Sequence, residues 1–599
     1  MLRRPMPRLL LALRRVLHND QLVLAVLAVV IGTASAAAAI GFRLLLGGIQ
    51  FLGYGFSSER VATLASKLPW WQVLLVPAAG GLLIGLMLRY LMPGRAAQGV
   101  ADVMEACALR GARMSLRTGI AAAAVSAASL GVGASTGREG PVVHLGASLG
   151  AWLARRLRLS AGLSRTLLGC GVAAAVAASF NAPIAGVFFA LEVVIGHYAL
   201  SAFAPIVLAS VMGTVVTRLY YGDFPAFILP QTYDIVSFLE FPAFALLGLV
   251  SALVAILFMK SVIVAGQAVE RTKLPLILRP AIGGLAVGAL AIWFPEVLGV
   301  GYETTDAALK AALPIWLLFA LIFIKAAATA ISLASGFGGG VFSPSLFLGA
   351  MSGGAFGMLA TRVLPELSSG HGAYTLVGMG AVAGAVLGAP ISTILIVFEM
   401  TGDYELTIAV MVAVVIASVV TDQALGRSLF TWQLERRGVS LRGGREIGLL
   451  SQIRVADVMK RDYVEISPGC TLVEMQEFLR TARYGELFVV DDDHRLLGIV
   501  TIADLAHAPT PMEGETPTAG DLARRDPPIL AADEEVRRAM RLMDSAGESH
   551  IPVVADHDSK RVVGFVHEHD VVLAYHRALL QARAEERGDS RAVGDPWQG

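Results

Sequence analysis

Long apolar runs follow one another from about residue 20 to residue 430, and beyond about residue 437 the chain turns polar. An apolar run of about 20 residues can cross the hydrocarbon core of a bilayer as a helix. The polar part carries Lys, Arg, Asp and Glu throughout. The pattern predicts an all-α polytopic membrane domain at residues 21–437, a linker at 438–453 and a tail outside the membrane.

The membrane part starts with two long apolar helices, predicted at residues 21–52 and 71–92. The segments that follow are shorter and rich in Gly and Ala, which allow helix backbones to approach closely. Several are too short to span a bilayer, so we expect re-entrant helices that turn back inside the protein. These segments are 97–109, 117–134, 140–156, 163–180, 184–200 and 201–220.

A polar link at residues 221–238 divides the membrane part into halves at about 21–220 and 239–437. The second half repeats the plan of the first, and we interpret the halves as inverted repeats. Its predicted segments are 239–266, 279–294, 313–335, 343–361, 373–387, 390–402 and 404–424.

One motif occurs in both halves. The stretches 137–150 and 340–353 both read G-x-x-x-P-x-x-x-L-G-A-x-x-G. Glycine, proline and then an apolar run indicate a broken helix that begins inside the membrane. Because the N-terminus of a helix carries unpaired N–H groups and a positive dipole end, paired broken helices favour an anion site.

A second pair of stretches follows in the same register. Ala-Pro-Ile at 182–184 precedes Glu192 by the spacing with which Ala-Pro-Ile at 389–391 precedes Glu399. The repetition suggests a structural role at helix ends for Glu192 and Glu399, and proton transfer is the alternative for Glu192.

Composition supports a membrane protein and says little about partners. Of the 599 residues 55% are hydrophobic and 16% are charged, and the net charge is +1. A nucleic-acid partner is not expected. Three scattered cysteines are too few for a disulfide framework or a zinc site. No arrangement of Ser, His or acidic residues resembles an enzyme's motif, so neither catalysis nor a bound metal is expected.

The N-terminal stretch, residues 1–20, combines leucines with several arginines. It lacks the small-residue cleavage site of a signal peptide, and it fits a basic amphipathic helix. The positive-inside rule then places the N-terminus in the cytosol.

The tail contains a repeat at residues 454–505 and 519–576, each with an amphipathic helix and two β runs. It resembles a tandem pair of α/β CBS domains, which we expect in the cytosol. The resemblance implies an adenine-nucleotide site at Thr501 and Asp504, with Asp570 in the second copy, where His567 replaces the hydroxyl residue. Alternatively, Asp504 only caps its helix. Residues 577–599 are predicted to be a helix end and a disordered tail.

Three stretches of the membrane part resemble the signatures of the CLC family of chloride channels and transporters. They are Gly-Arg-Glu-Gly-Pro at 137–141, Gly-Gly-Val-Phe-Ser-Pro at 339–344 and Asn-Ala-Pro at 181–183. The resemblance covers about residues 20–437 and implies a homodimer with one pore per subunit that passes chloride or other small anions. We expect it in the plasma membrane of a bacterium, with both termini cytosolic.

Glu139 is the predicted gate. A carboxylate at a helix N-terminus inside a membrane is costly and is usually functional. It can occupy the place of an anion, and its protonation or displacement would open the path. The alternative is a permanent pair with Arg138.

The resemblance also implies the anion-binding positions. At the second motif the backbone of Val341 and Phe342 would hold the ion, because glycines let the chain turn towards it. Two side chains depart from the family pattern: Gln98 stands at its usual serine and Phe430 at its usual tyrosine, so a central site would depend on backbone groups. The predicted anion-binding set is Gln98, Gly99, Val100, Arg138, Gly140, Gly340, Val341, Phe342 and Phe430.

Two further positions concern protons. Proton-coupled family members commonly carry a glutamate where this chain has Val193, which cannot carry a proton. His144 follows Glu139 by about one turn, and we consider it for pH sensing.

We therefore predict a passive, Glu139-gated chloride channel that the CBS pair regulates, and that needs no cofactor. The rival is a proton–chloride exchanger with an atypical relay. A divalent-cation transporter would need clustered intramembrane carboxylates, and a membrane-anchored nucleotide sensor would not need broken helices.

Overall fold

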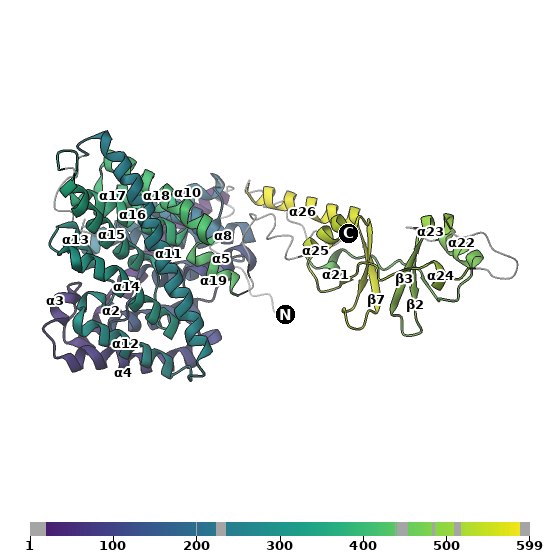
Figure 1. Cartoon of the computed structure of the whole chain (residues 1–599), viewed down its shortest axis with the longest axis horizontal. Helices are drawn as coiled ribbons and strands as arrows, with labels where there is room; N and C mark the ends of the chain where they lie inside the picture. Colours follow the sequence, from purple (N-terminus) through teal and green to yellow (C-terminus); the bar gives the residue numbers. More distant parts are fainter. Residues whose placement is uncertain are drawn as a thin grey trace. The chain divides into compact units, whose positions relative to one another are not determined.

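The computed structural model describes residues 20–198, 200–222, 235–363, 365–437, 439, 453–481, 485–507 and 517–586. Two compact units divide the chain between Ser440 and Leu441 (Figure 1). The helix predicted for residues 1–20 and most of the predicted linker lie outside the described residues.

Helices make up the first half of the membrane unit. Pro and Gly set their boundaries: Pro183 opens one helix at its first position, where the missing N–H costs no hydrogen bond. The elements are α2 (Asp20–Tyr54), α3 (Val61–Ala65), α4 (Trp70–Leu91), η1 (Pro93–Arg95), α5 (Val100–Leu109), α6 (Leu116–Gly131), α7 (Glu139–Leu157), α8 (Ala161–Phe180), α9 (Pro183–Phe189), η2 (Ala190–Ile195) and α10 (Leu200–Tyr221).

The second half follows the same plan. Pro390 opens α17 as Pro183 opens α9. The elements are η3 (Phe238–Glu240), α11 (Phe241–Arg271), α12 (Leu278–Trp293), η4 (Pro295–Val297), α13 (Tyr302–Leu309), α14 (Ile315–Ser335), α15 (Phe342–Val363), α16 (His371–Leu387), α17 (Pro390–Thr401), α18 (Tyr404–Leu425) and α19 (Leu429–Glu435).

The predicted membrane architecture is confirmed, and short helices are its main omission. Eight helices in the described residues are long and apolar enough to cross a membrane. The apolar pattern did not predict α3, α13 and α19, which have five, eight and seven residues. Segments this short contain too few turns to show a helical period.

The core of the membrane unit is built on close backbone contacts between neighbouring helices. A Cβ on Gly146 of α7 would lie 2.3 Å from the carbonyl oxygen of Gly171 in α8. In the second half, a Cβ on Gly349 of α15 would lie 2.3 Å from the carbonyl oxygen of Gly378 in α16. The glycine of the repeated Leu-Gly-Ala therefore sets the same helix contact in both halves.

The tail unit contains two small sheets with helices against them (Figure 1). The order is β1-β2-β3-β4 in one sheet and β5-β6-β7 in the other. In each, a short parallel pair precedes an antiparallel pair. The elements are α21 (Val455–Val458), β1 (Glu465–Ile466), α22 (Leu472–Thr481), β2 (Glu486–Val490), β3 (Leu496–Thr501), α23 (Ile502–Ala506), α24 (Ala519–Leu522), β4 (Arg524–Arg525), β5 (Leu530–Ala531), α25 (Val536–Ala546), β6 (His550–Val554), β7 (Val562–His567) and α26 (Glu568–Glu586).

The two tail repeats are interlocked. Lys460 of the first repeat pairs with Phe565 on β7 of the second. Conversely, β4 of the second repeat pairs with β3 of the first. An apolar cluster that includes Phe488 and Phe565 joins the repeats. The predicted tandem α/β pair is confirmed.

Candidate functional site: a carboxylate between two cavities

The two repeated motifs meet where α7 and α15 begin. Gly137 and Gly340 exchange two backbone hydrogen bonds, each with an N···O distance of 2.7 Å. A Cβ on Gly137 would lie 3.0 Å from Oε2 of Glu139 and 3.1 Å from the Gly340 carbonyl oxygen. Glycine at position 137 therefore lets the two chain segments and the carboxylate share this space.

Glu139 extends its carboxylate across this junction to the first turn of α15. The side chain is 1% exposed. Its Oε1 accepts a hydrogen bond from the Tyr302 hydroxyl at 2.6 Å, and its Oε2 accepts one from the Ser343 hydroxyl at 2.5 Å. Because Ser343 is the second residue of α15, the carboxylate lies where that helix N-terminus favours negative charge.

A cavity of about 440 Å³ lies on one side of Glu139. This larger cavity is lined by Glu139 and by residues at the starts of α5, α7 and α15 and on α19. It brings together eight of the nine predicted anion-binding residues: Gln98, Gly99, Val100, Gly140, Gly340, Val341, Phe342 and Phe430.

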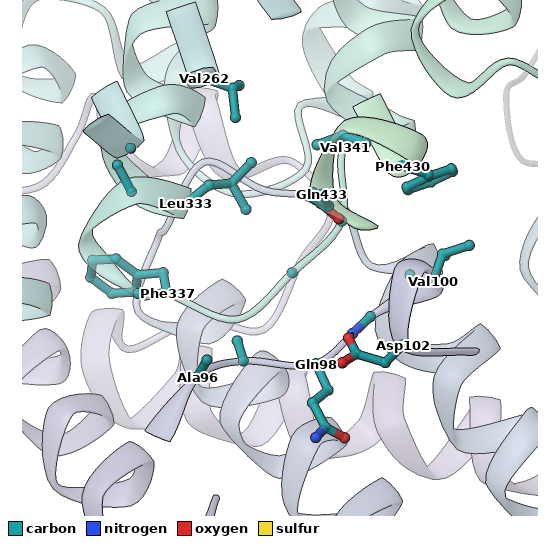
Figure 2. A pocket seen from close by; sticks show the side chains of 18 of the residues that line it. Ala96, Gln98, Val100, Asp102, Val262, Leu333, Phe337, Val341, Phe430 and Gln433 are labelled. Atoms are coloured by element: carbon teal, nitrogen blue, oxygen red, sulfur yellow. The ribbon is translucent and has the colours of Figure 1, made fainter. Parts of the chain in front are cut away.

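Side chains around the larger cavity are mostly apolar where the helix starts converge (Figure 2). In that view the Gln98 amide points away from Val341 and Phe430. Asp102, whose Oδ2 accepts from the Gly99 N–H at 2.8 Å, closes the first turn of α5. The Gln98 side chain is thus turned away from the second motif.

Four arginines are among the described residues that line the larger cavity, against the two carboxylates of Asp102 and Glu139. Arg437 lies 2.7 Å from Asp102, and Arg436 pairs with Glu270. The excess of guanidinium groups makes this cavity attractive to anions. The four arginines are Arg95, Arg279, Arg436 and Arg437.

Arg138 does not join the other predicted anion-binding residues. It lines a second, smaller cavity of about 290 Å³, together with Arg43, Glu59 and Tyr302. Its Nη1 donates to Glu59 at 2.9 Å, whereas its Nε is 3.9 Å from Glu139. Arg138 therefore lies apart from the eight residues that line the larger cavity, and its role in anion binding stays a prediction.

Gly340 lines the larger cavity, but its N–H donates to the Gly137 carbonyl. That N–H is therefore engaged in joining the two motifs. The next two residues, Val341 and Phe342, also line the cavity.

Glu192 and Glu399 form a second junction between the halves. Glu192 accepts from the N–H groups of Ile391 and Ser392 at 3.0 and 2.8 Å and from the Ser392 hydroxyl. Glu399 accepts from the N–H groups of Ile184 and Ala185 at 2.8 and 2.7 Å. Each carboxylate caps the broken helix of the opposite half, which confirms the predicted helix-end role.

Val193 lies at the junction of Glu192, and His144 lies on the helix that begins with Glu139. Val193 is buried in the π-helical turn η2, directly after Glu192. His144 is 1% exposed, and neither of its ring nitrogens has a hydrogen-bond partner in the described part of the chain. Val193 has no proton to give, and His144 is a buried imidazole five residues beyond Glu139 on α7.

The predicted nucleotide residues of the tail lie at equivalent places in the two repeats. Asp504 accepts from the N–H and hydroxyl of Thr501 at 2.8 and 2.7 Å, so it caps α23. It also lies 3.5 Å from Nε of Arg524. Asp570 lies 3.5 Å from Nζ of Lys460. Each aspartate thus sits beside a cation supplied by the other repeat.

Tyr302, Ser343, Arg43 and Glu59 are the residues of this site that sequence reasoning missed. Ser343 lies inside the repeated motif, and its hydroxyl was the one available signal. Tyr302, Arg43 and Glu59 come from three other segments, and nothing in their local sequence indicates that they converge.

Comparisons with known proteins agree with this arrangement. The family model described as voltage gated chloride channel matches residues 80–422, and the CBS domain model matches 455–510 and 519–577. The chain is 40% identical over 401 residues to a putative chloride channel protein ClcB-like of Ralstonia nicotianae. This match covers 66% of the chain and 92% of the relative.

A plant relative and two solved structures extend the likeness. Chloride channel protein CLC-f of Arabidopsis thaliana is 29% identical, over 88% of this chain and 76% of its own length. A slow cyanobacterial Cl−/H+ antiporter superposes with a TM-score of 0.62 at 22% identity, covering 69% of this chain and 97% of its own. A eukaryotic CLC transporter superposes with a TM-score of 0.61 at 21% identity, covering 91% and 97%. The chain is a member of the CLC family of voltage-gated chloride channels and transporters, with two CBS domains in its tail.

Proposed function

We propose that the protein conducts chloride and similar small anions passively, and that Glu139 is the gate. The observation that carries the proposal is the position of its carboxylate. The carboxylate lies at the N-terminus of α15, between the larger and the smaller cavity, and accepts hydrogen bonds from the hydroxyls of Tyr302 and Ser343. A group in this position competes with any anion that moves from one cavity to the other.

The same contacts suggest how the gate works. The hydroxyls of Tyr302 and Ser343 donate to a carboxylate, and they could donate equally to chloride. Protonation of Glu139 removes its charge and weakens both bonds, because bonds to an ionised acceptor are stronger than bonds to a neutral one. A mobile anion then takes the vacated place, and the arginines of the larger cavity raise the local anion concentration.

Passive conduction, rather than proton coupling, is supported by the second junction. Val193 cannot carry a proton, and the Glu192 oxygens are engaged by two N–H groups and a hydroxyl. The 40% identical relative is named as a putative chloride channel. The cyanobacterial antiporter and a CLC-type fluoride/proton antiporter are 22% and 24% identical to this chain, a likeness that concerns the fold.

The alternative is a proton-coupled exchanger with an atypical relay. His144 is the observation that favours it, since it is buried five residues beyond Glu139 and unpaired within the described residues. An imidazole can accept a proton at one ring nitrogen and release it from the other. A relay through His144 would replace the glutamate that Val193 excludes.

Assembly, orientation and regulation complete the proposal. We propose a homodimer with one pore per subunit, in a bacterial plasma membrane with both termini in the cytosol. Since α19 lines the larger cavity and leads towards the tail, that cavity would be the cytosolic one. An adenine nucleotide would bind beside Thr501 and Asp504, with Asp570 and Lys460 as the second, weaker place.

The deciding experiment uses purified protein in liposomes. An outward chloride gradient is imposed, the voltage is fixed with potassium and valinomycin, and the external pH is recorded. Chloride efflux without coupled proton movement is the expected result. Proton uptake against a proton gradient would establish an exchanger, and loss of that uptake in His144→Ala would then assign the relay.

A further inference from the structure

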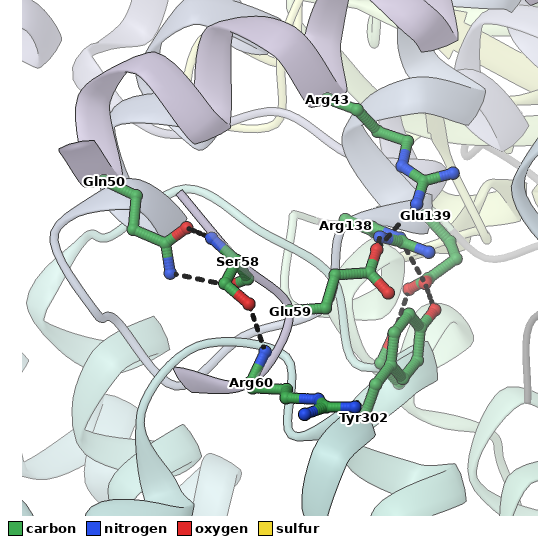
Figure 3. A network of polar contacts seen from close by, with 9 residues as sticks. Arg43, Gln50, Ser58, Glu59, Arg60, Arg138, Glu139 and Tyr302 are labelled. Atoms are coloured by element: carbon green, nitrogen blue, oxygen red, sulfur yellow. Dashed lines mark hydrogen bonds and ion pairs between the residues drawn. The ribbon is translucent and has the colours of Figure 1, made fainter. Parts of the chain in front are cut away.

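Three charged side chains meet in the smaller cavity, and Glu139 is not one of them. Oε1 of Glu59 lies 2.6 Å from Nη2 of Arg43 and 2.9 Å from Nη1 of Arg138. Glu59 stands in the loop between α2 and α3, whereas the arginines belong to α2 and to the start of α7. One carboxylate oxygen thus bridges two guanidinium groups from distant parts of the chain (Figure 3).

The three side chains differ in depth. Glu59 is 55% exposed, Arg43 is 30% exposed and Arg138 is 9% exposed. The carboxylate therefore faces the solvent and covers two cations that lie behind it. Guanidinium groups in this arrangement bind a carboxylate and a mobile anion by the same N–H donors.

The Glu59 side chain can move without its backbone. Gln50 fixes the preceding residue: its amide donates to the Ser58 carbonyl at 3.2 Å and accepts from the Ser58 N–H at 3.1 Å. Figure 3 shows both bonds beside the Glu59 carboxylate. Rotation about the side-chain bonds is thus enough to uncover the guanidinium groups.

Arg138 connects this cluster to the proposed gate. Its guanidinium lies over the Tyr302 ring, 4.5 Å from the ring centre, and the Tyr302 hydroxyl donates to Glu139. An anion held by Arg138 would therefore be next to the place that Glu139 fills.

Glu59 keeps its charge where other carboxylates lose theirs. Partial loss of water around the carboxylate raises the pKa of Glu59, but the positive charges of Arg138 and Arg43 outweigh this effect and lower the pKa to about 2. The other titratable groups lining this cavity are the phenols of Tyr54, Tyr221 and Tyr302. Displacement of Glu59 must therefore come from an anion rather than from a proton above about pH 4.

We infer that Arg43 and Arg138 form a second anion-binding site, and that Glu59 occupies it as a tethered competitor until a small monovalent anion replaces it. The inference rests on the proposed anion flux but not on whether protons are coupled to it. Glu59 sets the chloride concentration needed on the smaller-cavity side, whereas Glu139 sets the response to pH.

The test measures chloride flux in vesicles of known orientation. Protein is reconstituted so that most vesicles hold one particle or none, and vesicles with outward tails are separated on a resin that binds a tag at the C-terminus. Flux is recorded while chloride is varied on one side at constant ionic strength. The variants are Glu59→Gln, Arg43→Gln and the control Glu366→Gln, an exposed carboxylate in the loop between α15 and α16.

Glu59→Gln should lower the half-saturating chloride concentration on the smaller-cavity side by about three- to tenfold, and Arg43→Gln should raise it. The effect of Glu59→Gln should be the same at pH 5.5 and 7.5. Glu366→Gln should match the wild type.

Two results would overturn the inference. One is an unchanged dependence of flux on chloride in a Glu59→Gln protein that elutes from a size-exclusion column as the wild type does. Glu59 would then only order its loop. The other is loss of the pH response in Glu59→Gln, which would make Glu59 part of the proton-sensitive gate. Proton coupling in the wild type would refute passive conduction. The chloride dependence of Glu59→Gln would still decide whether Glu59 competes with the anion or only orders its loop.

Discussion

The two junctions between the halves share one arrangement but differ in the groups that donate hydrogen bonds to the carboxylate. At both, a carboxylate from one element reaches the N-terminus of a broken helix. Glu192 and Glu399 are each held by two backbone N–H groups of the helix that they cap. Glu139 is held by two side-chain hydroxyls and lies beside a cavity.

This difference separates a fixed anion from a displaceable one. Backbone N–H groups at a helix start cannot turn away, and removing their acceptor leaves buried donors unpaired. Hydroxyl groups rotate and can donate to another acceptor. We infer that the junction of Glu192 and Glu399 holds the halves together, whereas the junction of Glu139 can exchange its carboxylate for a mobile ion.

The largest effect is expected when Glu139 is neutralised. Glu139→Gln should abolish the pH dependence of chloride flux and leave its rate equal or higher, because an amide carries no charge to compete with the anion. For a single titrating gate, wild-type flux can change by up to about tenfold per pH unit. Flux from proteoliposomes at pH 4.5, 6 and 7.5 checks this.

Glu192→Gln is the matched control for that measurement and should keep the wild-type pH response. A well-folded Glu139→Gln protein without any flux would contradict the gate and would remove the contrast between the junctions.

Replacing a glutamate of the second junction by alanine should reduce the stability of the protein and leave its gating unchanged. Glu192→Ala removes the acceptor of three hydrogen bonds and should lower the free energy of unfolding by about 2–4 kcal/mol. Glu399→Ala should cost a similar amount, since it frees two N–H groups of α9. Thermal unfolding in detergent measures both.

If Glu192→Ala were as stable as the wild type but altered the pH dependence of flux, the carboxylate would belong to a proton path. That result would erase the distinction between a fixed and a displaceable carboxylate.

Removing one hydroxyl at the first junction should have a smaller, graded effect. Tyr302→Phe and Ser343→Ala each delete one bond to Glu139, which is worth about 1–2 kcal/mol when the acceptor is charged. The carboxylate should leave its place about 5- to 30-fold more often, and flux at neutral pH should rise.

The double variant should approach Glu139→Gln in its pH response. Flux at pH 7.5 for the single and double variants is the measurement, and Thr305→Val, a hydroxyl on α13 bonded to its own helix at the Gly301 carbonyl, is the control. Equal flux in all of them would mean that the hydroxyls do not hold the carboxylate.

The smallest effect is expected in the tail, where the two repeats offer a similar comparison. Burial and the neighbouring His550 lower the pKa of His567, which stands where the first repeat has Thr501. Below about pH 6.5 the unfolded tail therefore binds more protons than the folded one, and stability falls as the pH is lowered.

The loss should stay below about 0.5 kcal/mol because the side chain is only partly buried. His567→Thr should remove it. Protection factors for amide exchange in β6 and β7 of the full chain, at pH 7.5 and 5.5, report the difference. A steeper fall in the protection factors of His567→Thr than of the wild type would mean that His567 stabilises the tail at low pH.

The sequence alone was enough to predict most of the membrane architecture. Apolar run length predicted the long helices, and the repeated Gly and Pro positions predicted where α7, α15, α9 and α17 begin. It also determined Glu139 as the acid at a helix start and the reciprocal positions of Glu192 and Glu399. These features are local, because period, helix starts and repeat spacing are properties of short stretches.

The tertiary structure decided which groups face one another. Arg138 was grouped by sequence with the residues of the larger cavity, yet its side chain turns to Glu59 in the smaller one. Tyr302 begins a helix too short to show a period, and it meets Glu139 across 163 residues of chain. Such contacts depend on how helices cross and on side-chain direction, which no local pattern encodes, so the partners of the gate became visible only in the folded chain.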